Sequence, residues 1–292
     1  MTSEIICPLC QSRKNEIISE KLRYESPRKA YHCRDCGLVF LFPQMTAEEE
    51  RVFYEKEYGE IFSHEKGTTP AKLFEARLPD ARTYFSWIRD QVESTSDCLE
   101  LGCASGYFLA TIKDSVRSIA GIETHILLKE HCKKIGIPSF DSLDECGDGQ
   151  FDRIFMFFLL EHIGDPMSFL TSVKRVLRKN GKLFIVVPNV EDALMSLYDI
   201  PNFKPFYFTP AHQFYYSKST LARVLNKAGL HNMEIQPRQR YDLSNHMHWM
   251  MHGKPGGAGK YNSVFSDLLL KEYAKNLEDK FLCDTLLAVV TK

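Results

Sequence analysis

The sequence predicts an α/β fold, in which a parallel sheet is covered by helices on both faces and is preceded by a small N-terminal zinc ribbon. Two Cys-x-x-Cys pairs support the ribbon, and strand-like segments that alternate with amphipathic helices support the sheet. We expect a zinc ribbon over residues 1–45, a helical linker that caps the ligand site over 46–95, and an α/β domain over 96–292 with an insertion at about 241–283.

The composition is that of a globular protein. Hydrophobic residues make up 44% of the 292 positions, and 37 Lys and Arg nearly balance 38 Asp and Glu. This balance argues against a dedicated nucleic-acid-binding protein, which usually has a basic excess. No apolar run is long enough to cross a bilayer, and no apolar signal region stands near the start. We therefore expect a cytoplasmic protein with no membrane partner.

Four of the nine cysteines form two tight pairs, Cys7 with Cys10 and Cys33 with Cys36. Two such turns that face each other present four thiolates in the tetrahedral arrangement that Zn²⁺ prefers. The alternative is a pair of redox dithiols, which needs a thioredoxin-like context that this sequence lacks. Because four thiolates fill the coordination sphere, we expect a structural zinc ion, with a short hairpin between the two pairs.

Helices are expected between the ribbon and the sheet. Pro43 ends the strand-like segment LVFLF, and Thr46 followed by Glu49 is a capping box that predicts a helix start. A second helix is predicted over 71–92, where apolar residues form one loose face.

The rest of the chain alternates between the two element types. Strands are predicted at 97–101, 118–123, 137–141, 151–160, 182–189, 233–240 and 284–292. Helices are predicted at 106–114, 125–135, from Asp165-Pro166 to Asn180-Gly181, and at 217–228. The glycine-rich segment 253–260 is expected to be a surface loop between the last two strands.

The first strand of this alternation ends in a turn almost without side chains, Gly102 to Gly106. In parallel sheets ligands bind at the carboxyl ends of the strands, and small residues there let a ligand approach the backbone closely. Glu123 ends the next strand, where an acid can hold both hydroxyls of a ribose. A dinucleotide fingerprint fails because Ala104 and Tyr107 stand where glycines are needed, and a phosphate-binding loop fails because no Gly-Lys-Ser/Thr follows.

Residues 100–106, ELGCASG, resemble the first motif of class I S-adenosylmethionine-dependent methyltransferases. Residues 151–189 resemble that family's fourth strand, following helix and fifth strand, with Leu160-Glu161-His162 and Asp165-Pro166 matching closely. The resemblance covers about residues 96–292 and implies a Rossmann-like, seven-stranded methyltransferase sheet. The segments YHCRDCGLVFLFP and EEERVFYEKEY resemble a branch in which a zinc ribbon precedes the transferase domain. Members of that branch often serve sugar, polysaccharide or natural-product pathways.

The resemblance also implies a cofactor site for S-adenosyl-L-methionine. In it Glu100 contacts the amino end of the cofactor, Glu123 holds the ribose, and Phe158 with Leu159 forms a wall beneath the sulfonium. Asp141, Ser142 and Leu143 border the adenine. The implied cofactor-binding residues are Glu100, Gly102, Cys103, Ala104, Gly106, Tyr107, Glu123, Asp141, Ser142, Leu143, Phe158, Leu159 and Tyr58. Ala104 replaces the family's usual middle glycine.

Methyl transfer is an in-line displacement that requires an aligned acceptor and, for a hydroxyl or acidic carbon, the removal of a proton. His212 is the candidate base, because it lies on the loop that roofs the site in this family. Related sugar C-methylating enzymes have a Glu-His pair here, whereas this chain has Ala211 before the histidine. The alternative is that His212 only bonds a backbone carbonyl. Glu161 and His162 are the next candidates.

The segment 244–257 supplies the candidates for acceptor recognition, Asn245, His246 and Trp249. Its histidines have no nearby carboxylate or cysteine, so a substrate-contacting loop or a solvated surface is favoured over a metal site.

The predicted function is methyl transfer to a small-molecule acceptor, such as a nucleotide-linked or carrier-linked sugar or a natural-product intermediate. One alternative is an RNA methyltransferase whose ribbon binds the substrate, and another is a cofactor-binding module without turnover. The weak basic excess and the absence of an Asn/Asp-Pro-Pro-Tyr motif count against RNA. The sequence leaves open the acceptor, the methylated atom and the oligomeric state.

Overall fold

A seven-stranded sheet is the framework of the computed structural model, which describes residues 4–46, 48–49, 52, 69–198 and 200–292. Its strands are β4 (Asp97–Leu101), β5 (Ser118–Ile122), β6 (Ser139–Phe140), β7 (Phe151–Phe157), β8 (Leu177–Pro188), β10 (Asn232–Arg238) and β11 (Thr285–Thr291). Their order is β10-β11-β8-β7-β4-β5-β6. The neighbours from β8 to β6 pair in parallel, and β11 runs antiparallel to both β8 and β10. The predicted α/β fold with seven strands is confirmed.

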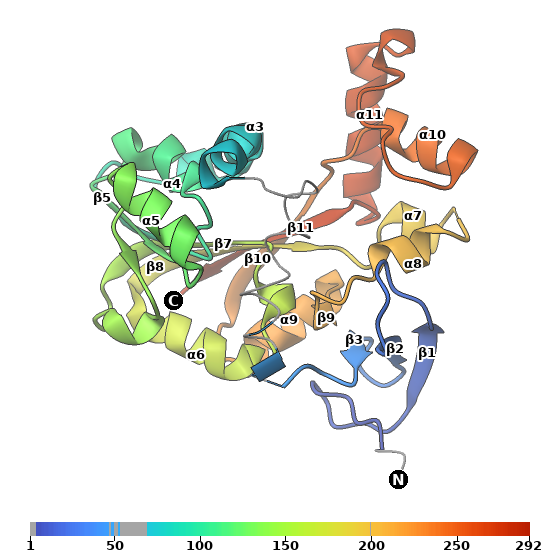
Figure 1. Cartoon of the computed structure of the whole chain (residues 1–292), viewed down its shortest axis with the longest axis horizontal. Coiled ribbons are helices and arrows are strands. Elements are labelled where there is room, and N and C mark those ends of the chain that lie inside the picture. The colour runs from blue at the N-terminus through green and yellow to red at the C-terminus, as the bar shows by residue number, and fades with distance from the viewer. Residues whose placement is uncertain (1–3, 47, 50–51, 53–68, 199) are drawn as a thin grey trace.

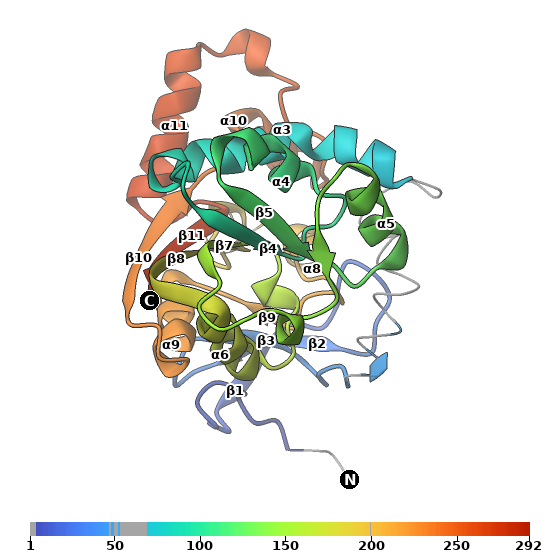
Figure 2. The same cartoon turned by 90° about the vertical axis from the view of Figure 1, so that its left-hand side faces the viewer.

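Helices cover both faces of this sheet (Figures 1 and 2). One face carries α3 (Pro70–Ile88), α4 (Tyr107–Ile112) and α5 (Ile126–Lys134), and the other carries α6 (Pro166–Val176) and α9 (Lys218–Lys227). Successive side chains of a central strand serve both layers: Phe155 packs under the α3–α4 layer, whereas Ile154 packs with Leu170 of α6. A strand buried on both faces explains the uninterrupted apolar run of β7.

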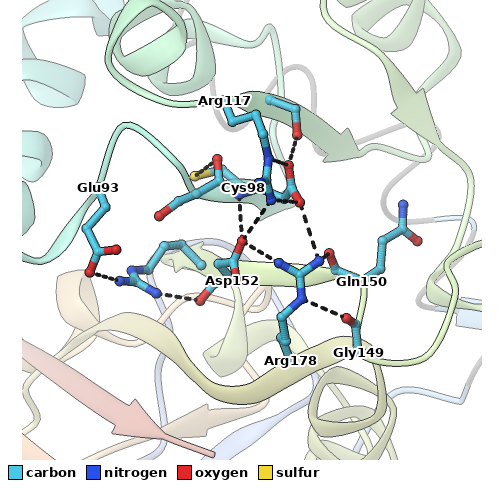
Figure 3. A network of polar contacts seen from close by, with 11 residues as sticks. Glu93, Cys98, Arg117, Gly149, Gln150, Asp152 and Arg178 are labelled. Carbon is cyan, nitrogen blue, oxygen red and sulfur yellow. Dashed lines mark hydrogen bonds and ion pairs between the residues drawn. The ribbon is translucent and has the colours of Figure 1, made fainter.

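A polar network closes the amino ends of the central strands (Figure 3). Arg117 bonds Asp97 at the start of β4, while Arg178 of β8 donates to Asp152 of β7 over 2.6 Å. The backbone N–H of Asp97 donates to the Asp152 carboxylate over 2.9 Å. Ligands of such sheets bind at the opposite, carboxyl ends, so this network joins the strands without contributing to a site.

The N-terminal module, residues 4–42, is attached to the larger domain through a second sheet. Its strands are β1 (Asn15–Ser19), β2 (Lys29–Cys33) and β3 (Val39–Phe42), and the fourth strand is β9 (Phe214–Tyr215). Val39 pairs with Tyr215, and Phe40 pairs with Phe214. The predicted hairpin between the cysteine pairs is present as β1 and β2, whereas strand β9 had no counterpart in the sequence analysis.

Arg28 reinforces this attachment from the turn that precedes β2. The residue is 5% exposed, and its guanidinium donates to the carbonyls of Pro43 (2.8 Å) and Pro210 (2.6 Å) and to Oε1 of Gln213 (2.6 Å). Two of these acceptors belong to the loop 209–213 of the larger domain. A buried cation is tolerated only when its donors are satisfied, so Arg28 and this loop stabilise each other.

The predicted helix after Asp165 ends earlier than expected. It was expected to continue to Asn180-Gly181, but α6 ends at Val176 because β8 already begins at Leu177. Asn180 has a positive φ of 64° inside this strand, and its N–H bonds the carbonyl of Lys292. A β-carbon at Gly181 would lie 3.0 Å from the Asp152 carbonyl oxygen, so the Asn-Gly pair lets the strand lie close to β7 instead of ending a helix.

The insertion is helical, which the sequence analysis did not predict for segment 244–257. Helices α10 (Leu243–His252) and α11 (Asp267–Asp279) project from the body of the molecule, as Figure 1 shows. Asp242 caps α10 by accepting from the Asn245 N–H over 2.8 Å, and Gly253, with φ of 60°, ends it. Residues 253–260 form a loop, as predicted, and lie between these two helices.

The capping box at Thr46 is present. The Thr46 N–H donates to the Glu49 carboxylate over 2.7 Å, and the Glu49 N–H donates to the Thr46 hydroxyl over 3.2 Å. Most of the helix predicted to follow lies outside the described residues. Among the described residues no helix is long and apolar enough to cross a membrane.

The role of Arg28 can be tested by substitution. We expect Arg28→Met to lower the free energy of unfolding by about 3 kcal/mol, because the acceptors in loop 209–213 lose a charged donor. The measurement is chemical denaturation. Arg34→Met is the matched control, since Arg34 pairs with Glu16 at the surface and its loss should cost less than about 1 kcal/mol. Equal losses for the two variants would contradict the assigned role.

Candidate active site

The side-chain-poor turn lies at the carboxyl end of β4, as predicted. The N–H groups of Gly102 and Cys103 both donate to the Ile122 carbonyl, over 2.9 and 3.0 Å, which ties the turn to the end of β5. Gly102, Ala104 and Gly106 have positive φ angles of 68°, 48° and 80°. Alanine at the middle position thus takes a conformation that favours glycine.

Two buried carboxylates flank this turn. Glu123 accepts from the N–H groups of Ala104 (2.9 Å) and His125 (2.7 Å) and is 9% exposed. One bond to each oxygen leaves lone pairs for further donors. Glu100 is 2% exposed, and its Oε2 has no hydrogen-bond partner among the described residues. Burial raises the pKa of both carboxyl groups. A polar group of a ligand that donates to Oε2 of Glu100 would satisfy this buried acceptor.

Leu159 lies against the turn, since a β-carbon at Gly102 would be 3.2 Å from its Cδ1. Phe158, at φ of 52°, has the Arg240 guanidinium 4.3 Å from its ring centre.

Of the residues expected near an adenine, Asp141 is exposed and pairs with Lys129. Ser142 accepts from the Asp144 N–H, and Leu143 is buried; Tyr107 begins α4. Tyr58 lies outside the described residues.

A cavity of about 290 Å³ lies beside the loop 209–213. Its lining combines charged and aromatic side chains from the N-terminal module, α3, α8 (Phe203–Tyr207), α10 and the start of β11. The charged and aromatic lining residues include Arg23, Tyr24, Arg77, His162, Asp192, Phe206, His212, Arg240, Trp249 and Asp284, and the amide Asn245 joins them. Aromatic walls with a few polar groups are typical of small-molecule sites.

Two of the predicted catalytic candidates, His162 and His212, line this cavity, and the third, Glu161, is buried beside them. Glu161, His162 and His212 offer nitrogen or oxygen atoms that all lie within 4.8 Å of one another, and the two imidazole rings stand edge to face at 4.6 Å. Nδ1 of His162 bonds the Ala211 carbonyl over 3.0 Å. Among the described residues, the two carboxyl oxygens of Glu161 have no hydrogen-bond partner, and Nδ1 of His212 has none either. Glu161 thus places beside His212 the acidic side chain that position 211 lacks.

Burial sets the charge of this cluster. It raises the pKa of Glu161 to about 8 and lowers the pKa of His162 to about 4. Burial, followed by the neighbouring His162 and the cation of Arg23, lowers the pKa of His212 well below its ordinary value. At pH 7 both imidazoles are therefore neutral, and a neutral imidazole can accept a proton. A carboxylate and two imidazoles are also a ligand set that a divalent cation can use.

The structure separates the candidates of segment 244–257. Asn245 and Trp249 line the cavity. His246 is not among the lining residues; its Nδ1 bonds the Tyr273 hydroxyl over 2.7 Å. Trp249 packs against Phe206 at a ring distance of 4.7 Å. Helix α10 therefore directs Asn245 and Trp249 to the cavity and His246 to α11.

The cysteines of the N-terminal module converge. Cys7 and Cys36 have their sulfurs 3.5 Å apart, as do Cys10 and Cys33, and all four sulfurs lie within 4.8 Å of one another. A tetrahedral Zn²⁺ with bonds of about 2.3 Å requires sulfurs about 3.8 Å apart, so the cluster fits such an ion.

Several cavity residues had not been selected from the sequence. Arg23 and Tyr24 come from the turn between β1 and β2, and Asp192 from the loop after β8. Arg240 follows β10 and meets Asp284 across the insertion at 3.4 Å. These residues stand in unrelated segments without a common spacing, so only the folded chain brings them together.

Comparisons with known proteins identify the family and the fold of the chain. A family model described as a methyltransferase domain matches residues 72–235. A curated relative, an uncharacterized 37.1 kDa protein in transposon TN4556 of Streptomyces fradiae, is 24% identical over 173 residues, 50% of each chain. The chain thus spans about half the length of that relative.

Two solved structures share the fold. A SAM-dependent methyltransferase from Archaeoglobus fulgidus is 17% identical with a TM-score of 0.53, over 81% of this chain and 100% of that one. The 1,6-didemethyltoxoflavin-N1-methyltransferase of Burkholderia thailandensis, solved with 1,6-didemethyltoxoflavin and S-adenosylhomocysteine, is 11% identical with a TM-score of 0.51, over 93% and 99%.

Proposed function

Because the chain belongs to the methyltransferase-domain family, we propose that it transfers a methyl group from S-adenosylmethionine to a small-molecule acceptor, such as a nucleotide-linked or carrier-linked sugar or a natural-product intermediate. The observation that carries this proposal is the side-chain-poor turn 102–106, flanked by two buried carboxylates. A cavity of about 290 Å³ supports an acceptor of small size.

The turn and its carboxylates fit the cofactor. Glu123 retains lone pairs for ribose hydroxyls, and the unsatisfied Oε2 of Glu100 suits a donor at the amino end. Gly102 has no side chain that would cover its backbone, and Leu159 provides an apolar side chain beside it. When bound, S-adenosylmethionine supplies an activated methyl group; the chain aligns the acceptor and excludes water.

His212 is proposed as the base that removes the acceptor's proton. Three observations support this role: it lines the cavity, its imidazole is neutral at pH 7, and its Nδ1 has no hydrogen-bond partner among the described residues. Glu161 and His162 lie beside it, and Glu161 would orient the imidazole after proton transfer.

The four cysteines are proposed to hold one structural Zn²⁺. Coordination fixes the two Cys-x-x-Cys turns, in which Gln11 and Gly37 donate to the carbonyls of Cys7 and Cys33 over 2.9 and 2.8 Å. The ion would stabilise the module that carries β3, and through β3 the loop that carries His212.

Cofactor binding is tested at Glu123. We expect Glu123→Gln to weaken the binding of S-adenosylhomocysteine by about 10- to 100-fold, because the charge-assisted bonds to the ribose are lost. Isothermal titration calorimetry measures the affinity, with thermal unfolding as a check of the fold. The exposed Asp144→Asn is the matched control. Wild-type protein that binds neither S-adenosylhomocysteine nor S-adenosylmethionine would overturn the proposed function.

The acceptor and the base are tested together by turnover. A library of sugar nucleotides and natural-product intermediates is incubated with isotopically labelled S-adenosylmethionine, and mass spectrometry detects the methylated product. We expect His212→Ala to keep cofactor affinity and to lower the rate at least about 100-fold. The exposed His231→Ala is the control. A His212→Ala enzyme that works at the parent rate would exclude the base role.

Metal content tests the cysteine cluster. We expect one equivalent of zinc in freshly purified reduced protein, measured by elemental analysis, and its loss in Cys36→Ser. Cys146→Ser is the control, since this buried cysteine lies outside the cluster. Protein without zinc would contradict the assignment. A second equivalent that His212→Ala removes would instead assign the Glu161–His162–His212 cluster to a cation.

A further inference from the structure

Among the described residues, one guanidinium that lines the cavity has no carboxylate partner. Arg77 donates to Asp80 over 2.9 Å, and Arg240 pairs with Asp284 at 3.4 Å. Arg23 forms no ion pair within the part of the chain that the structure describes. Its guanidinium carbon lies 4.2 Å from the ring centre of Phe206 and 5.6 Å from that of Tyr24.

The acidic groups of the cavity do not offset this charge. Asp284 is engaged by Arg240 and by the backbone N–H groups of residues 240 and 241. Burial and then the charge of Asp284 raise the pKa of Asp192 to about 7, so this carboxyl group is only partly ionised at neutral pH. The cavity therefore has a positive excess, located at Arg23.

The chain holds Arg23 in this position. The backbone N–H of Arg23 donates to the Phe208 carbonyl over 2.7 Å, at the end of α8. Arg28, five residues later, bonds the loop 209–213. The turn between β1 and β2 is thus fixed to the larger domain at both ends, and stacking on Phe206 orients the guanidinium without using its N–H donors.

We propose that Arg23 binds a phosphate or carboxylate group of the acceptor, so that the N-terminal module forms one wall of the acceptor site. This inference rests on the proposed function. It assigns to the module a part in acceptor recognition, in addition to the proposed binding of a structural metal ion. A planar guanidinium with free donors binds such oxyanions through two parallel hydrogen bonds, while the aromatic side chains around it accommodate the neutral part of the acceptor.

The experiment uses the full chain saturated with S-adenosylhomocysteine and two probes, inorganic pyrophosphate and citrate, which represent the phosphate and carboxylate sources. Isothermal titration calorimetry gives their affinities for wild-type protein and for Arg23→Gln, Arg23→Lys and Arg223→Gln. Arg223 is the control because it is exposed on α9 and does not line the cavity. The probe that binds more tightly identifies the source.

We expect Arg23→Gln to weaken that probe at least tenfold, Arg23→Lys to weaken it less because the charge remains, and Arg223→Gln to leave it unchanged. Equal affinities for wild type and Arg23→Gln, or no binding of either probe to wild type, would overturn the inference. A short single-stranded RNA that binds more tightly than both probes and depends on Arg23 would also overturn it. Cofactor saturation is measured first, so a failure there identifies the proposed function as the error.

Discussion

The structure depends on the contacts that attach the N-terminal module to β9 and to the loop that precedes it. Strands β3 and β9 are joined by two residue pairs, Val39 with Tyr215 and Phe40 with Phe214. The buried guanidinium of Arg28 adds hydrogen bonds to the same loop, so segments about 180 positions apart are held together. His212 stands directly before this pairing. Backbone hydrogen bonds of a ladder allow little local freedom, so the position of His212 is set by a segment that lies outside the methyltransferase domain itself.

The two halves of the site follow different physical rules. The proposed cofactor half is mainly backbone: a turn of small residues with positive φ angles, hydrogen-bonded to the end of β5 and flanked by Glu100 and Glu123. The proposed acceptor half consists of side chains from many segments, beside buried ionisable groups whose pKa values are shifted by desolvation. The first half therefore depends on the ends of β4 and β5, whereas the second depends on loops and helices from several parts of the chain.

The sequence was sufficient to predict the larger sheet, because buried strands such as β7 and capped helices such as α6 have strong local signals. It also located the turn at Gly102 and the acid at Glu123, since both directly follow strands. It was insufficient for β9, whose two residues lie in an aromatic run without alternation. Helix α10 was missed although Asp242 and Gly253 are ordinary end signals, because the glycine-rich segment after it suggested a loop. Arg23 could not be found at all, since its contacts are with residues far along the chain.

Strand β11 lies between β8 and β10 although it follows both of them in the chain. A nascent polypeptide that has emerged from the ribosome only as far as α11 therefore has two strands whose edges await a common partner. The ion pair between Arg240 and Asp284 has likewise not formed at that stage, because Asp284 follows α11. During synthesis, then, the cavity beside loop 209–213 is completed late, and until that moment the apolar edge of β8 is exposed to chaperones.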